Sequence, residues 1–289
     1  MATISIVTPS FNQGFFIEAT INAILDQNFK ALEYVIIDGG STDNTVNVIK
    51  KYESRLHYWV SEPDGGQYSA INKGFAQTSG DIMAWLNSDD LYMPWAFETV
   101  ATIFDKFPEI EWLTTSMPVG VDACGNVIKV IPVYGFTKGG FLAGDNLIEA
   151  GTHGSCFIQQ ESTFWRRSLW ERTGGHVDEG LKYAADFELW ARFFQNATLY
   201  AVDIPLGSFR RHDNQKTSYA FNDYLDEARR IFREYGGKRQ NPSIQGARLK
   251  LRTCLPSWLF VSLFRYGFME PAYLVTYDWG LCDWKIVRS

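Results

Sequence analysis

In the first third of the chain, short apolar runs alternate with segments whose apolar residues recur at helical spacing. The runs at residues 4–7, 33–37, 56–60 and 82–86 predict buried strands. A helical pattern follows each run, and after the first run it is carried by Ile17, Ile21, Ile24 and Leu25. Repeated strand–loop–helix units imply right-handed crossovers between parallel strands. The sequence therefore predicts an α/β fold with a mostly parallel central sheet.

The rest of the chain has a less regular pattern. It predicts, in order, a hairpin over 112–133, a Gly-rich loop region over 135–154, a strand near 156–160, a helix over 185–194, strands over 199–203 and 206–211, a surface helix over 219–235 and a polar linker over 236–250. No internal repeat or low-complexity tract is visible in the sequence. The fold prediction therefore depends mainly on the first half.

Three polar, Gly-rich or acidic loops follow the predicted strands of the first half at their C-terminal ends. They are DGGS at 38–41, DGGQ at 64–67 and NSDD at 87–90. Each loop alone is equally explained as a capped turn before a helix. Ligands of open α/β sheets bind at the carboxyl edge of the strands, and all three loops fall at that edge. Together they predict one binding site there.

The NSDD segment is the strongest local feature. Asp89 and Asp90 place two carboxylates directly after a buried strand, where they offer hard oxygen ligands to Mg²⁺ or Mn²⁺. The structural explanation is an acidic cap for the helix that Pro94 opens. From the residues alone, both interpretations remain open.

The second half contains fewer candidates. Asp186 and Glu188 open a predicted helix, where acids also interact favourably with the helix dipole. His212 is a lone histidine after a strand, and such a histidine is more often structural than a ligand. Trp165 and Arg166 either bind a sugar or phosphate, or form a packed aromatic residue beside a solvated charge. None of these residues identifies a reaction by itself.

Composition and motifs exclude several classes. The chain is 46% hydrophobic and 21% charged, as in ordinary globular proteins, and its net charge of -6 argues against a nucleic-acid partner. Its four cysteines are widely spaced, without the pattern of a zinc site or a disulfide framework. The P-loop, GxGxxG and GxSxG motifs are absent. There is no signal-peptide pattern and no uncharged run of roughly 18 residues, so we expect a cytoplasmic protein.

Taken together, these segments resemble the family-two inverting glycosyltransferases with the GT-A fold. The matching stretches are ISIVTPSFNQGFFIEATINAILDQNF, EYVIIDGGSTDNTVNVIKKY, SEPDGGQYSAINKGF, GDIMAWLNSDDLYMP, FWRRSLWERTGG and YAADFELWARF. The resemblance is almost continuous from residue 4 to about 94, returns in the second half and fades after about 218. The combination is specific to that family, although no single stretch is.

The resemblance implies a role for each matching position. A nucleotide-sugar donor is expected to contact Thr8, Pro9, Ser10, Asp38, Gln67, Asn72, Lys73, Asn87 and Ser88. The DxD-type motif of the family aligns with residues 87–89, so Asp89 is expected to hold Mn²⁺ or Mg²⁺, with His212 as a late metal ligand. Asn87 stands where the family usually has its first acid. Asp186 aligns with the catalytic base, and the acceptor is expected beside Trp165 and Arg166.

The activity implied by the resemblance is metal-assisted transfer of a sugar from a nucleoside diphosphate, with UDP favoured, to a hydroxyl of a saccharide or lipid-linked acceptor. The transfer inverts the anomeric centre, and polysaccharide biosynthesis is the expected setting. One alternative is a catalytically silent nucleotide-sugar binding or scaffolding protein, which the Asn87 departure favours. Another is a sugar-phosphate nucleotidyltransferase, but that class is expected to have a Gly- and Arg-rich loop where this chain has TPSFNQG.

These expectations divide the chain into two parts. Residues 1–218 form the GT-A domain, with a nucleotide-binding half over 1–94 and an acceptor half over 95–218, and a short C-terminal helical extension occupies 219–289. The apolar, aromatic stretch at 255–266 either packs as a helix against the protein or lies on a membrane surface. The second interpretation suits a lipid-linked acceptor at the inner face of the membrane.

Overall fold

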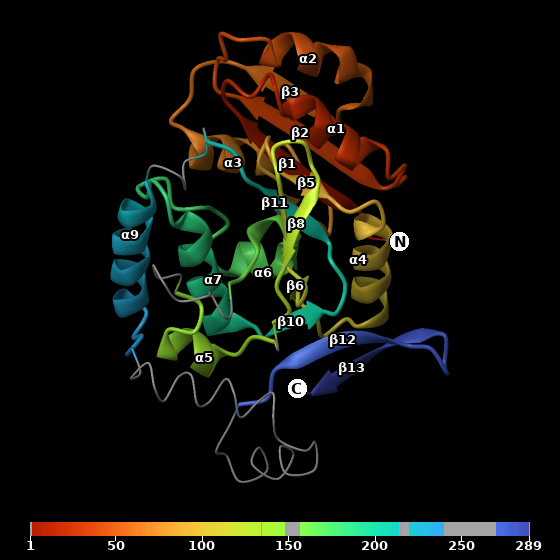
Figure 1. Ribbon diagram of the computed structural model, residues 1–289, viewed down its shortest axis with the longest axis vertical. Coiled ribbons are helices and arrows are strands. Elements are labelled where there is room, and N and C mark those ends of the chain that lie inside the picture. Colours follow the sequence, from red (N-terminus) through yellow and green to blue (C-terminus); the bar gives the residue numbers. More distant parts are fainter. Residues whose placement is uncertain are drawn as a thin grey trace.

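The computed structural model describes residues 2–133, 135–147, 157–213, 215, 220–239 and 270–288, and all structural statements refer to these residues. Its centre is a nine-stranded sheet in the order β13-β12-β10-β6-β9-β4-β1-β2-β3 (Figure 1). The strands are β1 (Ile4–Ser10), β2 (Leu32–Asp38), β3 (Tyr58–Ser61), β4 (Ile82–Trp85), β6 (Trp112–Thr115), β9 (Phe164–Arg166), β10 (Leu199–Val202), β12 (Tyr273–Asp278) and β13 (Asp283–Arg288). Neighbours are parallel except where β9 and β13 pair, which confirms the predicted mostly parallel sheet.

A second sheet has four short strands in the order β5-β11-β7-β8. They are β5 (Leu91–Tyr92), β11 (Gly207–Arg210), β7 (Val119–Val121) and β8 (Val127–Val130). The predicted hairpin over 112–133 is therefore only partly correct, because its first strand, β6, joins the central sheet and the hairpin is formed by β7 and β8. This small sheet brings β11 beside the segment that follows β4.

Most helices agree with the apolar periodicity, but the helix at Lys138–Ala143 lies within the predicted Gly-rich loop region, so that prediction was wrong for these residues. The helices are α1 (Ile17–Leu25), α2 (Thr45–Tyr52), α3 (Gln67–Phe75), α4 (Ala96–Lys106), α5 (Lys138–Ala143), α6 (Arg167–Arg172), α7 (Ala185–Asn196) and α9 (Phe221–Glu234), with 3-10 turns η1 (Glu53–Arg55) and η2 (Gln160–Ser162). Every residue of β1 is buried, as expected for a parallel strand covered on both faces. No described helix is long and apolar enough to cross a membrane.

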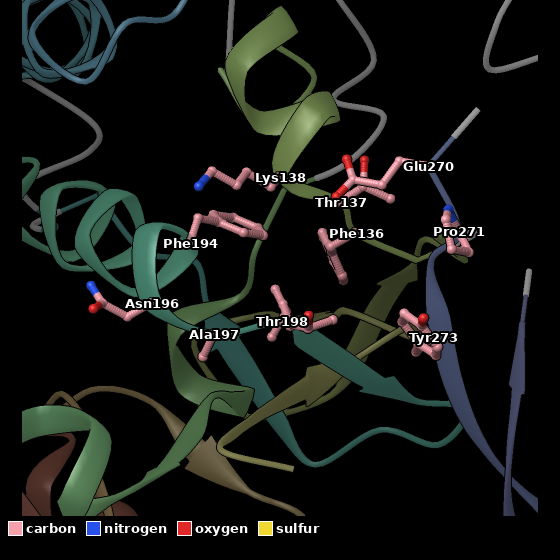
Figure 2. Close-up of a pocket in the computed structure, with 11 residues that line it drawn as sticks. Phe136, Thr137, Lys138, Phe194, Asn196, Ala197, Thr198, Glu270, Pro271 and Tyr273 are labelled. Carbon is pink, nitrogen blue, oxygen red and sulfur yellow. The ribbon is translucent and has the colours of Figure 1, made fainter. Parts of the chain in front are cut away.

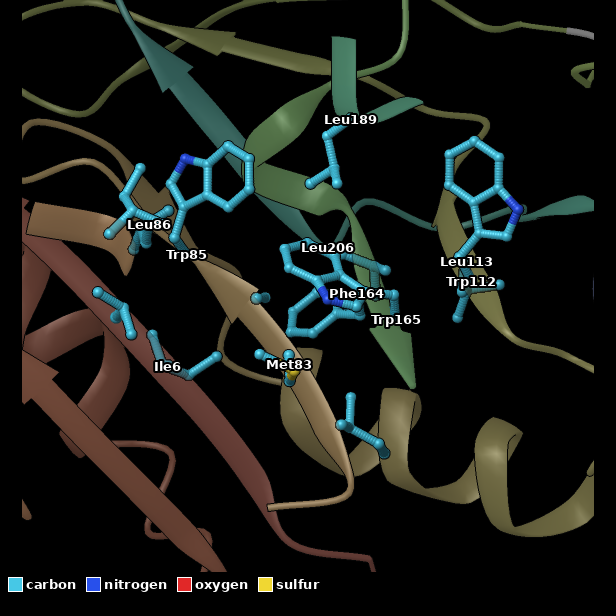
Figure 3. Close-up of a cluster of buried hydrophobic side chains, with 14 of the residues drawn as sticks. Ile6, Met83, Trp85, Leu86, Trp112, Leu113, Phe164, Trp165, Leu189 and Leu206 are labelled. Atoms are coloured by element: carbon cyan, nitrogen blue, oxygen red, sulfur yellow. The ribbon is translucent and has the colours of Figure 1, made fainter. Parts of the chain in front are cut away.

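Four tryptophans from different elements form the centre of the core. Trp165 on β9 lies 5.5 Å from Trp85 on β4, measured between ring centroids. Trp190 on α7 stacks on Trp112 of β6 at 5.7 Å and lies parallel to Trp85 at 6.1 Å. Figure 3 shows Trp85, Trp112 and Trp165 among the apolar side chains that surround them. Aromatic contacts of this kind hold β4 and α7 together. Asp89 follows β4, and Asp186 lies on α7.

The prediction of a helical C-terminal extension was wrong for its last part. Helix α9 is present, but β12 and β13 form a hairpin, and β12 pairs in parallel with β10. The hairpin is fastened to α4 by Lys106, which contacts the Asp283 carboxylate and the Trp284 carbonyl oxygen. The β12–β13 hairpin is thus part of the central sheet. Its backbone groups are satisfied by pairing with β10, a distant strand, and local sequence periodicity does not predict such a pairing. The apolar stretch at 255–266 lies outside the described residues.

The Glu33 carboxylate, at the start of β2, accepts several hydrogen bonds at the edge of the sheet opposite the predicted site. Its Oε2 accepts from Ser5 Oγ at 2.8 Å, Ser79 N at 2.7 Å and Gly80 N at 3.0 Å, and its Oε1 accepts from Ser79 Oγ at 2.7 Å. Partial burial opposes ionisation, but the hydrogen bonds from Ser79, Ser5 and Gly80 outweigh it and lower the pKa of Glu33 from 4.5 to about 2.

This pKa gives a prediction for acid stability. A depressed folded-state pKa adds stability above pH 4.5, and that part is lost as the pH falls from 4.5 towards 2. Because Glu33 is partly exposed, Glu33→Gln is expected to lower the free energy of unfolding by only about 1 kcal/mol at neutral pH. Urea unfolding at pH 7 and pH 3 should show a smaller pH dependence for the variant than for the parent. An equal change in the exposed control Glu53→Gln would contradict the assignment.

Candidate active site

The segment that follows β4 and the segment that follows β11 meet at the carboxyl edge of the sheet. His212 Nε2 lies 3.0 Å from Asp89 Oδ2, although 123 positions separate the two residues in sequence. Their side chains are 6% and 17% exposed, so the pair is accessible from one side only. The structure therefore brings together the two residues that the resemblance assigns to a metal.

This pair has suitable chemistry for a divalent cation. A carboxylate oxygen and an imidazole nitrogen are both accepted by Mn²⁺. Within the described ranges, no group of three or more His, Cys, Asp or Glu side chains surrounds a common point. Asp89 and His212 would thus supply two ligands, and diphosphate oxygens and water would complete the shell, as is usual for cations that bind phosphates. The residues present fit a metal that arrives with a nucleotide.

Arg210 and Phe16 support the pair, and sequence reasoning missed both. Arg210 donates from Nε to the Asp89 carbonyl oxygen at 2.6 Å and from its backbone N–H to Asp90 Oδ1 at 2.8 Å. The Phe16 ring lies 4.3 Å from the His212 ring and 5.1 Å from the Arg210 guanidinium carbon. These contacts limit the movement of His212 relative to Asp89. A basic residue two positions before the histidine was the only signal of this role in the sequence.

Asp186 lies in the first turn of α7, at the N-terminal end of the helix. Burial raises its pKa from 3.8 to about 6, while the hydrogen bond that its Oδ1 accepts from the Phe187 N–H at 2.7 Å opposes the shift. A carboxylate of this kind is a better proton acceptor near neutral pH than an ordinary aspartate. It lines a small hollow with Asn146, Phe157, Ile158, Phe187, Trp190 and Tyr224.

The first turn of α3 connects the metal side of the site to Asp186. Gln67 donates from Nε2 to Asn87 Oδ1 at 2.7 Å. The hydroxyl oxygen of the next residue, Tyr68, accepts the backbone N–H of Ala185 at 3.3 Å. Since these two residues are consecutive, the NSDD segment and the start of α7 flank one turn of helix. These contacts place the NSDD segment and the start of α7 close together.

Helix α9 is also part of this site. The Glu227 carboxylate accepts the backbone N–H groups of Lys182, Tyr183 and Ala184, at 3.0, 2.8 and 2.7 Å. These are the residues that lead into α7, so α9 holds the start of the helix that carries Asp186. The prediction placed α9 outside the transferase domain, and the structure makes it a support of the candidate base.

The donor residues predicted on β1 are largely enclosed. Thr8 has no exposed surface, and its Oγ1 accepts the Tyr34 hydroxyl at 3.2 Å, so the prediction that Thr8 contacts a ligand was wrong. Pro9 is buried as well. Ser10 is 6% exposed, and its hydroxyl has no hydrogen-bond partner among the described residues. Of the three, Ser10 alone remains a candidate for donor contact.

Asp38 is buried and hydrogen-bonded. Its Oδ1 accepts from Ser41 Oγ, and its Oδ2 accepts from the Gly40 and Ser41 N–H groups and from Ser61 Oγ at 2.6 Å. Three of these four hydrogen bonds are made to Oδ2 and one to Oδ1. These contacts shape the DGGS loop and fasten it to β3, and contact of this carboxylate with a nucleoside stays a prediction.

Three further residues that were predicted to contact the donor are Asn72, Lys73 and Ser88. Asn72 donates from Nδ2 to the Val177 carbonyl oxygen and to Glu179 Oε1, both at 2.8 Å, and accepts the Val177 N–H at 2.7 Å. Its amide thus holds the 177–179 loop and is not available to a ligand, which corrects the prediction. Lys73 pairs with Glu62 and stays 32% exposed. Ser88 is buried, with its carbonyl oxygen accepting the Thr20 hydroxyl.

The prediction that Trp165 and Arg166 contact an acceptor was wrong. Trp165 has no exposed surface and belongs to the tryptophan cluster (Figure 3). Arg166 donates from Nε to the Ile110 carbonyl oxygen at 2.8 Å and from Nη2 to that of Phe104 at 2.7 Å. It lies opposite Ile82, the first residue of β4, whereas Asp89 follows the last. Both side chains serve packing, since β9 runs antiparallel to its neighbours.

Sequence reasoning also missed Gln160 and Glu161, which lie behind the NSDD segment. Gln160 donates from Nε2 to the Trp85 carbonyl oxygen at 2.7 Å. Glu161 is 3% exposed, and burial raises its pKa from 4.5 to about 7. The available signal was the polar stretch QQEST at 159–163. The strand predicted near 156–160 is not present over residues 157–159, and η2 begins at Gln160.

A larger cavity, of about 380 Å³, lies elsewhere (Figure 2). It is lined by Phe136, Thr137, Lys138, Phe194, Asn196, Ala197, Thr198, Leu199, Glu270, Pro271 and Tyr273. It includes the end of α7 and the start of β10, whereas Asp186 is at the beginning of α7. None of the predicted site residues lines it, so cavity size does not locate the candidate site.

Comparison with known sequences gives the same family as the motifs. The family described as "Glycosyl transferase family 2" matches residues 5–115. An uncharacterized glycosyltransferase of Mycobacterium tuberculosis is 31% identical over 245 residues, which cover 82% of this chain and 87% of that protein. One of Rickettsia typhi is 27% identical over 221 residues, covering 76% of this chain and 67% of that protein.

Solved structures show the same fold at lower identity. S. aureus TarS in complex with UDP-GlcNAc has a TM-score of 0.63 and 17% identity, covering 84% of this chain and 69% of its own. The mannosyltransferase PcManGT from Pyrobaculum calidifontis, in complex with GDP-Man and Mn²⁺, has a TM-score of 0.57 and 16% identity, covering 93% and 76%. With the motif order, the sheet and the relatives in agreement, the chain belongs to glycosyl transferase family 2 and has the GT-A fold.

Proposed function

We propose that this protein is a metal-dependent, inverting glycosyltransferase that moves a sugar from a nucleoside diphosphate to an acceptor hydroxyl. The observation that carries the proposal is the first turn of α3, where Gln67 contacts Asn87 and Tyr68 contacts the start of α7. One turn of helix thereby joins the Asp89–His212 pair, which has the chemistry of metal ligands, to Asp186, a partly buried aspartate with a raised pKa. A transferase needs both, one for the leaving group and one for the acceptor.

The leaving group is a nucleoside diphosphate, which departs with negative charge on its terminal phosphate. Asp89 and His212 would hold Mn²⁺ or Mg²⁺ there, and a bound cation supplies a Lewis acid that stabilises this charge. Solved relatives of the fold are complexes with UDP-GlcNAc, with GDP-Man and Mn²⁺, and with UDP and Mn²⁺. These complexes support a metal and a nucleotide sugar, and we propose UDP as the nucleotide.

The acceptor is proposed to be a saccharide or lipid-linked hydroxyl that reaches Asp186. Asp186 Oδ1 is held by the Phe187 N–H, and the carboxylate takes the hydroxyl proton as the oxygen attacks the anomeric carbon. Attack on the face opposite the leaving group inverts the configuration, so an α-linked donor gives a β-linked product.

The first test is the melting temperature in the presence of UDP, GDP, CDP or dTDP, each with Mn²⁺, Mg²⁺ or a chelator. A ligand at 100 times its dissociation constant adds about 2.7 kcal/mol to stability, which raises the melting temperature by several degrees at this size. We expect a shift with one nucleotide that disappears with the chelator. No shift with any nucleotide would sink the proposal and favour a silent relative. The anomeric configuration of the product, read by NMR, then tests inversion.

A further inference from the structure

Asn87 occupies the first position of the DxD-type motif, and both ends of its amide are used. Oδ1 accepts from Gln67 Nε2 at 2.7 Å. Nδ2 donates to Asp90 Oδ2 at 3.3 Å and to Gln160 Oε1 at 3.4 Å. An aspartate at this position has no donor for either of the last two contacts. The amide is therefore chemically required by its surroundings.

The two acceptors that Asn87 meets are oriented by other contacts. Asp90 is 1% exposed, and its Oδ1 accepts the Arg210 N–H at 2.8 Å. Gln160 is 5% exposed, and its Nε2 donates to the Trp85 carbonyl oxygen at 2.7 Å, which leaves Oε1 facing Asn87. Gln160 cannot turn its amide N–H groups towards residue 87 without giving up this buried hydrogen bond, and Asp90 presents Oδ2 to Asn87 as an acceptor.

The space behind the NSDD segment already contains two acids. Glu161 is 3% exposed, and no described residue is a hydrogen-bond partner of its Oε2. Asp90 is the second of these acids, and both side chains are almost fully buried. A third carboxylate at position 87 would add like charge where solvent screening is weak. Both hydrogen bonding and charge thus favour an amide.

We propose that Asn87 is a positioning residue: its amide holds the segment that carries Asp89 between α3 and η2, while position 87 itself does not bind the metal. The Asn in place of the usual acid is then an adaptation to buried Asp90 and Glu161, and not a sign of lost activity. The metal part of this inference rests on the proposed function. The hydrogen-bonding part does not.

The hydrogen-bonding part is tested by exchanging donor and acceptor. Asn87→Asp places a carboxylate against the two acceptors Asp90 Oδ2 and Gln160 Oε1. In Asp90→Asn, the Oδ1 of the new amide must still accept the Arg210 N–H, so its N–H groups face the N–H groups of Asn87. Each single change is expected to lower Tm by several degrees. The double variant N87D/D90N restores a donor opposite an acceptor and should recover more than half of the N87D loss. The exposed Asn47→Asp control, which adds the same charge, should leave Tm unchanged.

The parent, N87D, D90N and N87D/D90N form a double-mutant cycle. If the Tm change of the double variant equals the sum of the two single changes, the inference is overturned, and this measurement needs no ligand. The metal part is read from Mn²⁺ titrations of nucleotide binding, where N87D is expected to weaken the apparent Mn²⁺ affinity about tenfold and N87D/D90N to restore it. Tighter Mn²⁺ binding by N87D would make residue 87 a metal ligand and overturn the proposal. If the parent binds no nucleotide, the proposed function fails, while the Tm cycle still decides whether Asn87 positions the segment.

Discussion

Replacing Asp186 by Asn is expected to lower turnover by roughly 10²–10⁴-fold and, at the same time, to make the protein more stable. The loss follows because an amide cannot accept the acceptor's proton. Donor binding should persist, since the donor contacts lie on the other side of the first turn of α3. Asn can still accept the Phe187 N–H through its own Oδ1, so the start of α7 keeps its hydrogen bond.

The gain in stability follows from the raised pKa of Asp186. A folded-state pKa of about 6 against 3.8 means that the fold favours the protonated form, so the contribution of Asp186 to stability is fully present below pH 3.8 and is lost as the pH rises through 6. At pH 7.5 the parent bears the whole cost, on the order of 1–3 kcal/mol. Asp186→Asn removes this cost and should raise the melting temperature, a common trade between activity and stability.

The pH profile separates this role from a merely structural one. In the parent, kcat/KM should rise with pH through an apparent pKa near 6, as Asp186 loses its proton. In Asp186→Asn, the residual rate should not show this rise. Asp226→Asn, at a side chain 79% exposed on α9, is the matched control and should change neither quantity. A near-normal rate for Asp186→Asn would remove Asp186 from the role of base.

Asp89→Ala is expected to abolish the metal dependence of nucleotide binding and to lower turnover by roughly 10²–10³-fold, similar to removing one strong transition-state contact. The carboxylate contacts His212 Nε2, whereas the neighbouring Arg210 contact is made to the Asp89 backbone oxygen. The substitution therefore removes a metal ligand but leaves the segment fastened to β11. The melting temperature without ligand should change little.

The measurement is a melting-temperature series with the active nucleotide over increasing Mn²⁺, for the parent, Asp89→Ala and His212→Ala. Both variants should lose the Mn²⁺-dependent shift, because each removes one of the two protein ligands. Asp226→Ala serves as the control for loss of a carboxylate. If Asp89→Ala kept the metal dependence of the parent, the ligands would lie elsewhere in the chain.

Sequence alone determined the features that are local in character. The strand–loop–helix order of the first half is set by apolar periodicity, and the observed β1, α1, β2, α2, β3, α3 and β4 follow it. The polar loops at 38–41 and 87–90 were correctly expected at one edge, because parallel strands all end there. Residues 89 and 212 were assigned to one cation by resemblance, and they do lie in contact.

Tertiary structure alone decided which polar side chains have their hydrogen bonds inside the protein. Asp38, Asn72 and Thr8 have suitable chemistry for a donor site, but their hydrogen bonds are used inside the protein, and only the folded arrangement shows this. Glu227 connects α9 to the residues that lead into α7. The pairing of β12 with β10 adds a segment that is distant in sequence to the central sheet. Local pattern reports burial and periodicity, whereas the partner of a buried polar group depends on which distant segments pack against it.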